Sequence, residues 1–304
     1  MIPSGEYIYL PDDPKKVDGL VNVPGESQED DDASSGVYMV DIVIRKASLL
    51  ERLFPEIHGG SSLVPAKEFN PENLPARVRR EQSLAEMTAS QKIATAVALR
   101  ELGYTVDSLG LEVKEVEVGS PADGPLKPGD LITEAEGELV KTPEELRTVM
   151  EDVEPGESVR LQIERDGEEQ DVTVGTKESS DQPPRAIMGI LIEPQLDFPV
   201  DITIDAGQVG GPSAGLAFAL DIYDELGEDI DEGRKVVVTG ALDLDGRVVA
   251  IGGIKQKTYA AHDADADLFL VPDRNAADAR KYAGDTRVVP ISSFREALSI
   301  LANP

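Results

Sequence analysis

The hydrophobic pattern of the first hundred residues predicts one strand and one helix. Residues 37–45 alternate with apolar side chains on both faces, which is typical of a strand buried on both sides. Across residues 83–102, apolar side chains recur at helical spacing, and Gly103 then ends the helix. Residues 1–35 and 59–77 are irregular and rich in proline, glycine or acidic side chains, which indicates loops.

Between residues 104 and 176 the pattern changes to short strands separated by turns. Residues 111–118 alternate weakly, as a strand does, and residues 142–145 form a capping box with proline at the first helical position. An Asp-Gly pair between residues 158–164 and 170–175 is a strong hairpin signal. The segment therefore predicts a small β-rich domain that contains one short helix.

The last part of the chain has the pattern of an α/β domain. Residues 177–189 are polar and are interpreted as a linker. From residue 190 to residue 304, strands and helices alternate, with strands expected at residues 200–205, 235–239 and 268–271. The predicted fold class is α/β (α+β), with the small β-rich domain in addition.

The composition limits the classes of function. The 304 residues are enough for two domains, and 4% aromatic content without tryptophan predicts aliphatic cores. The formal charge of -30 argues against nucleic-acid binding, which needs clustered lysine and arginine, and against docking of the chain's own surface on anionic lipid. An acidic excess of this size is more often a solvated surface than a binding site.

Several kinds of chemistry lack the residues they need. The absence of cysteine excludes disulfides, thiolate metal sites and cysteine nucleophiles, and two histidines argue against a zinc site or a Ser-His-Asp triad. Because the sequence has no Gly-x-x-x-x-Gly-Lys-Ser/Thr loop, we expect no ATP hydrolysis. We also expect no cofactor and no metal. No apolar run approaches the ~18 residues that span a bilayer, and Met1 begins no signal-peptide pattern. As written, the chain is expected to be soluble.

A glycine-rich turn provides a candidate nucleophile. Residues 210–215 read Gly-Gly-Pro-Ser-Ala-Gly, in which the glycines allow a tight turn and Pro212 presets the first helical residue. This places Ser213 in the first turn of a helix, where free N–H groups and the positive helix end stabilise an oxyanion. The expected turn and oxyanion residues are Gly211, Pro212 and Ala214. The alternative is a serine and a proline that only begin a helix.

A second glycine-rich segment provides a candidate base. Residues 252–257 read Gly-Gly-Ile-Lys-Gln-Lys, and Lys255 and Lys257 lie about 200° apart around a helix. Lys257 shares its face with an isoleucine and three alanines, whereas Lys255 lies on the polar side. A lysine acts as a base only when desolvation keeps it neutral, so the apolar face selects Lys257. Lys255 is interpreted as a solvated surface charge.

These segments together resemble the proteolytic domain of Lon proteases, which use a Ser-Lys dyad. The resemblance covers about residues 190–304 and includes a Val-Thr-Gly element between the serine turn and the lysine segment. It implies Ser213 as nucleophile, Lys257 as general base, and Thr239 as the residue that orients the lysine amine. Many Lon enzymes carry aspartate where this chain has Gly210, which leaves the local shape of the site open.

The segment from residue 104 to residue 176 resembles a PDZ domain. Leu109, Gly110 and Leu111 precede a strand and resemble the carboxylate-binding loop of that family. The resemblance implies a groove between this strand and the helix that begins at Thr142, where an extended peptide binds by strand addition. The alternative is a small β-rich insert without a ligand.

A PDZ-like segment combined with a Lon-like segment resembles the bacterial PDZ domain-containing Lon-like serine proteases. This resemblance covers most of residues 36–304. Residues 36–103 are then expected to pack with the proteolytic domain, and the PDZ domain is an insertion. The implied function is ATP-independent cleavage of unfolded or loosely folded proteins by a serine endopeptidase, with a PDZ module that binds peptide segments or C-termini. The alternatives are a catalytically silent PDZ adaptor or scaffold with a Lon-like fold, and a regulatory subunit that works only within a ring.

The family resemblance also has implications for partners and location. It implies a homo-oligomer, a hexameric ring, with unfolded protein or peptide substrates and no nucleic acid. It also implies an N-terminal membrane anchor that holds the protease outside the cytoplasmic membrane in the full-length protein. The sequence as given contains no such anchor.

Overall fold

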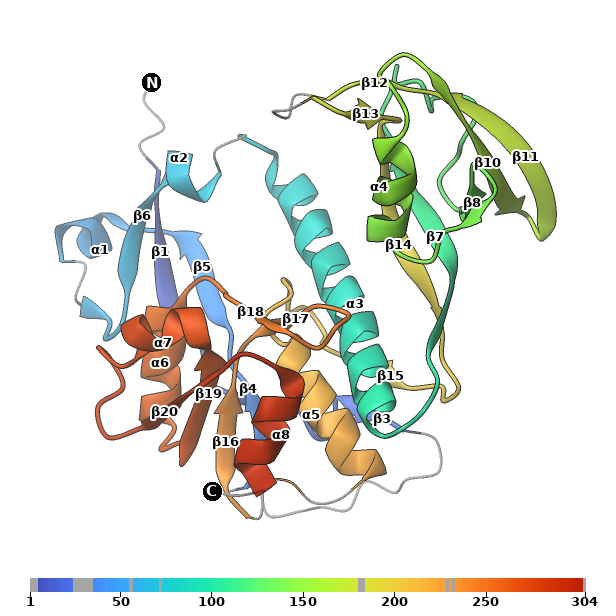
Figure 1. Cartoon of the computed structure of the whole chain (residues 1–304). Coiled ribbons are helices and arrows are strands. Elements are labelled where there is room, and N and C mark those ends of the chain that lie inside the picture. The colour runs from blue at the N-terminus through green and yellow to red at the C-terminus, as the bar shows by residue number, and fades with distance from the viewer. Residues whose placement is uncertain are drawn as a thin grey trace. The chain divides into compact units, whose positions relative to one another are not determined.

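The computed structural model divides the chain into two compact units, and the second is inserted between the two halves of the first (Figure 1). The first unit comprises Met1–Tyr104 and Val200–Pro304, and the second comprises Thr105–Pro199. Each unit has a hydrophobic core of its own. The structure describes residues 5–23, 35–54, 57–70, 73–179, 184–227, 230 and 233–302.

A five-stranded sheet forms the centre of the first unit. Its strands, in spatial order, are β2 (Lys15–Lys16), β4 (Gly36–Met39), β16 (Lys235–Val238), β19 (Leu268–Pro272) and β20 (Arg287–Ile291). The helices around it are α3 (Ala76–Glu101), α5 (Gly215–Leu226), α6 (Ile254–Asp263), α7 (Asp273–Ala279) and α8 (Phe294–Ala302). β4, β16, β19 and β20 run parallel, and β2 runs antiparallel to β4. The apolar strands are buried because α3, α5 and α8 pack on one face of the sheet and α6 and α7 on the other.

A smaller sheet and two short strand pairs also belong to the first unit. The sheet consists of β5 (Ile42–Lys46), β1 (Glu6–Pro11) and β6 (Ser62–Pro65), with the short helices α1 (Leu49–Leu53) and α2 (Ala66–Phe69) beside it. The pairs are β3 (Val21–Asn22) with β15 (Thr203–Ile204), and β17 (Ala241–Leu242) with β18 (Val248–Val249).

The N-terminal half differs from the sequence prediction at three places. The strand expected at residues 37–45 is broken before Ile42, so that β4 pairs with β16 while β5 pairs with β1 in the other sheet. The expected loops at residues 1–35 and 59–77 contain β1, β2, β3, β6 and α2. Helix α3 begins at Ala76, earlier than the predicted start at residue 83. The prediction missed its first turns because they are mostly exposed and polar and therefore carry no apolar period.

The second unit is a sheet with one helix packed against it. Its strands are β7 (Asp107–Val116), β8 (Leu131–Ala135), β9 (Glu138–Leu139), β10 (Ser158–Arg165), β11 (Glu168–Gly175), β12 (Lys177–Glu178), β13 (Ala186–Ile187) and β14 (Ile190–Asp197). The main sheet has the order β11-β10-β8-β7-β14, and β12 pairs with β13. Helix α4 (Pro143–Glu151) begins with the expected capping box, in which Thr142 and Glu145 each accept a hydrogen bond from the other's backbone N–H.

The C-terminal boundary of the second unit lies later than the sequence indicated. β14 was expected to open the α/β domain, but it pairs antiparallel with β7 along its whole length and forms an edge of the second unit's sheet. Ile190 and Ile192 pack against the core of this unit. The polar stretch at residues 177–189 is not a plain linker, because β12 and β13 pair within it. Local alternation cannot show which distant strand a segment will pair with.

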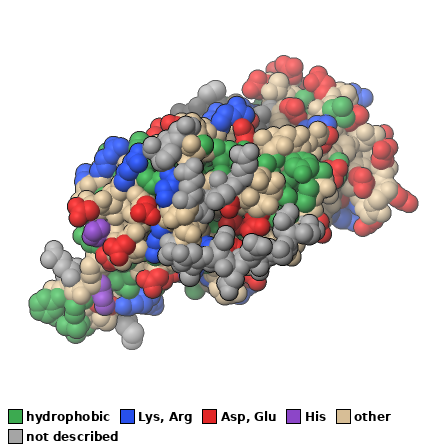
Figure 2. Space-filling model, turned by 90° about the horizontal axis from the view of Figure 1, so that it is seen from below, with side chains coloured by type: hydrophobic (Ala, Val, Ile, Leu, Met, Phe, Trp, Pro, Cys, Tyr) green, Lys and Arg blue, Asp and Glu red, His purple; other side chains and the backbone are tan. Residues whose placement is uncertain are grey.

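Acidic side chains are spread across the face drawn in Figure 2, with lysine and arginine among them. Some form surface ion pairs, such as Arg247 with Asp243 and Arg295 with Glu101. This distribution agrees with the interpretation of the acidic excess as a solvated surface. In the part of the chain that the structure describes, no helix has the length and apolar character to cross a bilayer.

One acidic side chain lies in the core of the first unit. Asp221 on α5 is 3% exposed, and its Oδ2 atom is buried without a hydrogen-bond partner among the described residues. Burial, and then the nearby carboxylates of Glu225, Asp18 and Asp224, raise the pKa of Asp221 well above its ordinary value. The folded protein therefore holds this proton more tightly than the unfolded chain does.

Asp221→Asn is expected to raise the free energy of unfolding at pH 8 by about 1–2 kcal/mol, because asparagine carries no charge to bury. A carboxyl whose pKa is higher in the folded state contributes to the free energy of unfolding. This contribution is complete below the unfolded pKa and is lost as the pH rises through the folded pKa. Urea unfolding of both proteins at pH 5 and pH 8 measures the effect, which should be larger at pH 8. Asp285→Asn, at an exposed position, is the control. A gain for Asp221→Asn that is equal at both pH values would contradict this explanation.

Candidate active site

The serine turn lies immediately before α5. Ala214 is the N-cap of α5, so Ser213 precedes the helix and does not lie in its first turn as expected. Gly211 has a φ of +84°, a conformation that glycine adopts without strain. The carbonyl of Ser213 accepts hydrogen bonds from the N–H of Gly240 at 2.9 Å and from Thr239 Oγ1 at 3.3 Å. The turn is therefore fixed by the segment that follows β16.

The space around Gly210 is too small for a side chain. A Cβ atom at this position would overlap the hydroxyl of Ser83, which lies on α3. The carbonyl of Ser83 also accepts the N–H of Gly211 at 2.8 Å, so α3 and the turn are held in close contact. An aspartate at position 210 would require Ser83 to move, which explains in physical terms why this chain has glycine there.

Lys257 reaches the serine from the first turns of α6. Its side chain is 2% exposed, and its Nζ lies 2.6 Å from Ser213 Oγ and 3.1 Å from Thr239 Oγ1. Gly253, with a φ of +70°, caps the helix and thereby places Lys257 one turn later. Burial lowers the pKa of Lys257 to about 8, and the carboxylate of Asp41 opposes this shift. A substantial fraction of this lysine is therefore neutral at slightly alkaline pH.

Lys255 was expected to be a solvated surface charge, and this is wrong. Its Nζ donates a hydrogen bond to the carbonyl of Ser61 at 2.7 Å, while the neighbouring Gln256 donates to the carbonyl of Gly60 at 2.9 Å. Both side chains hold the segment before β6 against α6. Lys255 nevertheless points away from the serine, as the helical geometry requires.

Thr239 lies between the serine turn and the lysine. Its side chain is fully buried, and its Oγ1 donates to the Ser213 carbonyl while it accepts from Lys257 Nζ. Because the hydroxyl proton of Thr239 is directed to Ser213, its lone pairs face the lysine. A neutral Lys257 that donates one N–H to Thr239 can turn its own lone pair toward Ser213 Oγ.

Two backbone N–H groups are available for a developing negative charge. In the described structure, the N–H groups of Ser213 and Ala214 donate to no protein acceptor. Of the residues expected here, Gly211 donates its N–H to Ser83 and Pro212 has none, so only Ala214 keeps a free donor. The N–H of Ser213 itself was missed. Both free groups lie at the N-terminal end of α5, where the helix dipole favours negative charge.

A cavity of about 620 Å³ opens onto Ser213 and Lys257. One part of its wall is apolar and another part is polar. The apolar part consists of Ile42, Ile44, Val249 and Ile251, and the polar part includes Tyr9, Asp41, Arg80, Ser83 and Gln208. No local pattern pointed to most of these residues, because they come from β1, β5, α3, β18 and the loops beside them. In the described part of the chain, no group of three His, Asp or Glu side chains could hold a metal ion.

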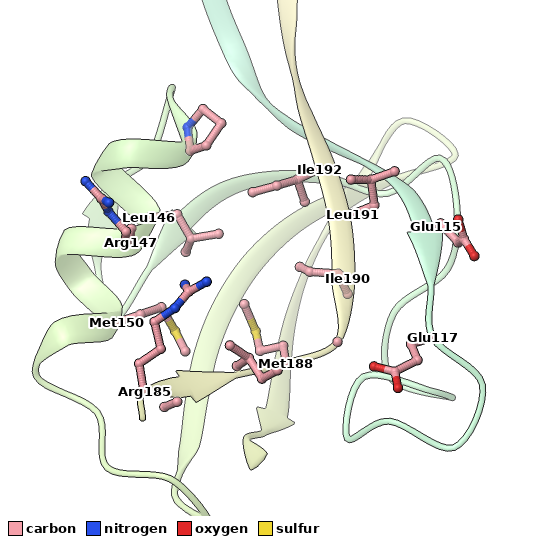
Figure 3. Close-up of a pocket in the computed structure, with 14 residues that line it drawn as sticks. Glu115, Glu117, Leu146, Arg147, Met150, Arg185, Met188, Ile190, Leu191 and Ile192 are labelled. Carbon is pink, nitrogen blue, oxygen red and sulfur yellow. The ribbon is translucent and has the colours of Figure 1, made fainter. Parts of the chain in front are cut away.

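A second cavity, of about 580 Å³, lies within the inserted unit between α4 and β14 (Figure 3). Its apolar wall is formed by side chains from both elements and from the loop before β14. These are Leu146, Met150, Met188, Ile190 and Ile192. Arg147 and Arg185 lie on the α4 side in Figure 3, and Glu115 and Glu117 lie on the opposite side. Because β14 is an edge strand, it offers unpaired backbone groups next to this cavity.

Leu109, Gly110 and Leu111, where the sequence predicted a carboxylate-binding loop, do not line this cavity. Leu111 is fully buried in the core, and a Cβ on Gly110 would lie 2.5 Å from the carbonyl oxygen of Ile132. The loop beside the cavity is Met188-Gly189-Ile190, where Gly189 has a φ of +84°. Its apolar-Gly-apolar pattern was a usable signal, but the strand after it had been assigned to the other domain.

Comparisons with known proteins give one match for each unit, and each match lies mostly within that unit. Residues 194–300 match the model of the Lon protease (S16) C-terminal proteolytic domain, and residues 85–176 match that of the PDZ domain. A Lon protease of Chloroflexus aggregans is 37% identical over 94 residues, which is 29% of this chain and 11% of that protein. Lon protease 2 of Bacillus subtilis is 34% identical over 110 residues, which is 36% of this chain and 19% of that protein.

The chain thus spans less than a fifth of the length of these curated relatives. Among solved structures, the PDZ domain of an SdrC-like protein from Listeria innocua is similar, with 26% identity and a TM-score of 0.26. That match covers 28% of this chain and 93% of the Listeria chain.

Proposed function

We propose that this chain, which combines a Lon-type proteolytic domain with a PDZ domain, is a serine endopeptidase that uses a Ser213–Lys257 dyad. The observation that carries the proposal is the 2.6 Å contact between Lys257 Nζ and Ser213 Oγ. The lysine is buried and its pKa is lowered to about 8, as a general base requires. Both residues border a cavity that can admit a peptide segment.

Acylation proceeds in two proton transfers through the lysine. Neutral Lys257 accepts the hydroxyl proton of Ser213 as Oγ attacks the carbonyl carbon of the substrate. The carbonyl oxygen becomes negative and is stabilised by the N–H groups of Ser213 and Ala214. When the C–N bond breaks, Lys257 returns the proton to the leaving amine, and the substrate's acyl group remains on Ser213.

Deacylation repeats these steps with water as the nucleophile. Neutral Lys257 takes a proton from the water as its oxygen attacks the ester carbon. The tetrahedral intermediate collapses, the ester bond to Oγ breaks, and Lys257 gives the proton back to Ser213. Thr239 keeps one lysine N–H occupied throughout, so that the amine lone pair stays directed at the reacting oxygen.

We propose unfolded or loosely folded proteins as substrates, cleaved without ATP. The apolar wall of Ile42, Ile44, Val249 and Ile251 favours the apolar side chains that unfolded segments expose. The given sequence has no P-loop with which to couple ATP hydrolysis to unfolding. A casein-type degradation assay with and without ATP tests this part, and equal rates are expected.

We propose that the groove between α4 and β14 binds peptide segments or C-termini. An extended peptide can pair with the edge of β14 while its side chains enter the apolar cavity. Bound segments are thereby tethered to the chain that carries the proposed dyad, which raises their effective concentration for cleavage. The alternative, a catalytically silent adaptor, would use this groove alone.

Met150→Gln is expected to weaken peptide binding in the groove by about 5- to 30-fold, because an amide would replace an apolar wall group. Degradation of an unfolded protein should slow, while hydrolysis of a very short fluorogenic peptide should be unchanged. The matched control is Val118→Gln, since Val118 belongs to the same unit but is 92% exposed and outside the cavity. Equal slowing by both variants, or none by either, would refute the groove's role.

We further propose, from the family resemblance, that the protein forms a homo-oligomeric, hexameric ring. A mass measurement in solution tests this, and a monomer at working concentration would contradict it. The membrane anchor and the location outside the cytoplasmic membrane are likewise proposals for the full-length protein. Cell fractionation with the full-length protein tests them.

A further inference from the structure

Helix α3 contributes a buried hydroxyl to the serine turn. Ser90 is 3% exposed, and its Oγ donates a hydrogen bond to the carbonyl of Pro212 at 2.9 Å. Gly215, at the first position of α5, makes room for this contact, because a Cβ there would lie 2.6 Å from Ser90 Oγ. The last glycine of the Gly-Pro-Ser-Ala-Gly turn therefore has a specific partner on α3.

The position of the Pro212 carbonyl determines the direction of the Ser213 N–H. Both groups belong to one planar trans peptide unit, in which C=O and N–H point in opposite directions. A bond that holds the carbonyl toward Ser90 on α3 therefore turns the Ser213 N–H the other way. The same geometry applies one residue later, where Gly240 and Thr239 hold the Ser213 carbonyl and so direct the N–H of Ala214.

We propose that Ser90 is a positioning residue that aims the Ser213 N–H at the substrate oxyanion through the Pro212 carbonyl. This inference rests on the proposed peptidase function and adds a residue to it. Ser90 does not touch Lys257 or the substrate cavity. Its effect is thus on the oxyanion donor and leaves the base as it is. The N–H of Gly215 also donates to the Pro212 carbonyl, at 3.2 Å, so loss of Ser90 loosens the peptide unit without freeing it.

Ser90→Ala is expected to lower kcat about 10-fold with little change in KM, because an oxyanion donor acts in the transition state and not in substrate binding. This loss is smaller than the roughly 100-fold expected when a donor is removed altogether. The affinity for a peptide boronate, which forms a tetrahedral adduct with the serine, should fall in the same proportion as kcat/KM. The pH at half-maximal rate should not move, since the pKa of Lys257 is set by its own burial.

The double variant Ser90→Ala/Gly215→Ala separates hydrogen bonding from packing. The methyl group at position 215 fills the space that the hydroxyl leaves but cannot donate to the Pro212 carbonyl. The double variant should therefore fold well and remain slow. The control is Thr95→Ala, which removes another buried hydroxyl of α3 that bonds only within the helix, to the carbonyl of Gln91 at 3.0 Å.

The outcomes distinguish this inference from the proposed function. A wild-type kcat in Ser90→Ala, a full recovery of kcat in the double variant, or a loss confined to KM would overturn the positioning role. So would an equal loss of kcat in Thr95→Ala. If Ser213→Ala cleaves as fast as the wild type, the peptidase mechanism itself fails. If Ser213→Ala is inactive and Ser90→Ala is fully active, only this inference fails.

Discussion

Lys257→Met is expected to lower peptide hydrolysis by about 10³- to 10⁴-fold while the protein stays folded. Methionine has nearly the length of the buried lysine stem but offers no amine to accept the Ser213 proton. Because a buried amine is replaced by an apolar group, the thermal unfolding midpoint should not fall. Lys257→Arg should be equally inactive, since a guanidinium stays protonated at any working pH.

The matched control is Lys255→Met, which removes a lysine two residues away on the same helix. Its Nζ bonds the carbonyl of Ser61 and not the serine, so activity should stay within a few-fold of wild type. A loss of the same size in both variants would mean that the helix, and not the base, had been disturbed.

The pH dependence of the wild-type rate follows from the same residue. The pKa of Lys257 is lowered to about 8 by burial, and only the neutral amine can act as a base. The rate of hydrolysis of a short peptide should therefore rise with pH, reach half its maximum near pH 8, and level off above it. The residual rate of Lys257→Met should lack this rise. A wild-type profile that falls between pH 7 and pH 9 would contradict a neutral lysine base.

Ser213→Ala is expected to lower cleavage of unfolded protein by roughly 10⁴-fold or more, because among the described residues the only other hydroxyl that hydrogen-bonds to Lys257 is that of Thr239. The Thr239 hydroxyl is buried and already donates to a carbonyl, so it cannot replace the serine. Degradation of casein by the variant and the wild type, each with and without ATP, measures the effect.

Peptide binding by the inserted unit is the internal control for this variant. The groove between α4 and β14 belongs to a different compact unit from Ser213, so Ser213→Ala should bind peptide as the wild type does. This result would separate a peptidase from a silent adaptor, which would show peptide binding and no serine-dependent cleavage. Full activity in Ser213→Ala would show that the mechanism is wrong.

The local sequence was informative where helix geometry alone decides the outcome. The serine turn and the lysine helix were identified from glycine positions and from the apolar face of one helix. The structure brings together Ser213 from the turn before α5, Thr239 from the end of β16 and Lys257 from α6. Their catalytic roles remain the proposal that the variants above test.

Sequence reasoning failed where pairing between distant segments decides the structure. β14 alternates as any half-buried strand does, and nothing within it shows that β7 is its partner. The sequence therefore predicted the carboxylate-binding loop at Leu109–Leu111, whereas the cavity of this unit is lined by the Met188-Gly189-Ile190 loop. In the same way, the sequence did not predict the break between β4 and β5, where Asp41 lies close enough to Lys257 to affect its pKa.

Contacts of the serine turn with α3 were also beyond the sequence. Three features of the turn depend on how α3 packs on α5. They are the lack of room for a Cβ at Gly210 beside Ser83, the hydrogen bond from Gly211 to Ser83, and the space for Ser90 at Gly215. These residues are more than a hundred positions apart, so no local pattern connects them. Gly210 and Gly215 are explained by this packing, whereas Gly211 is explained by its positive φ.

Covalent labelling of Ser213 by a fluorophosphonate probe tests the central claim most directly, because the probe reacts only with an activated serine. Mass spectrometry of the labelled wild type, Lys255→Met and Lys257→Met would identify the modified residue and its rate. The account predicts labelling of Ser213 in the wild type and in Lys255→Met, and loss of labelling in Lys257→Met. Labelling of Ser213 at the same rate in Lys257→Met, or no labelling of Ser213 in the folded wild type, would contradict it.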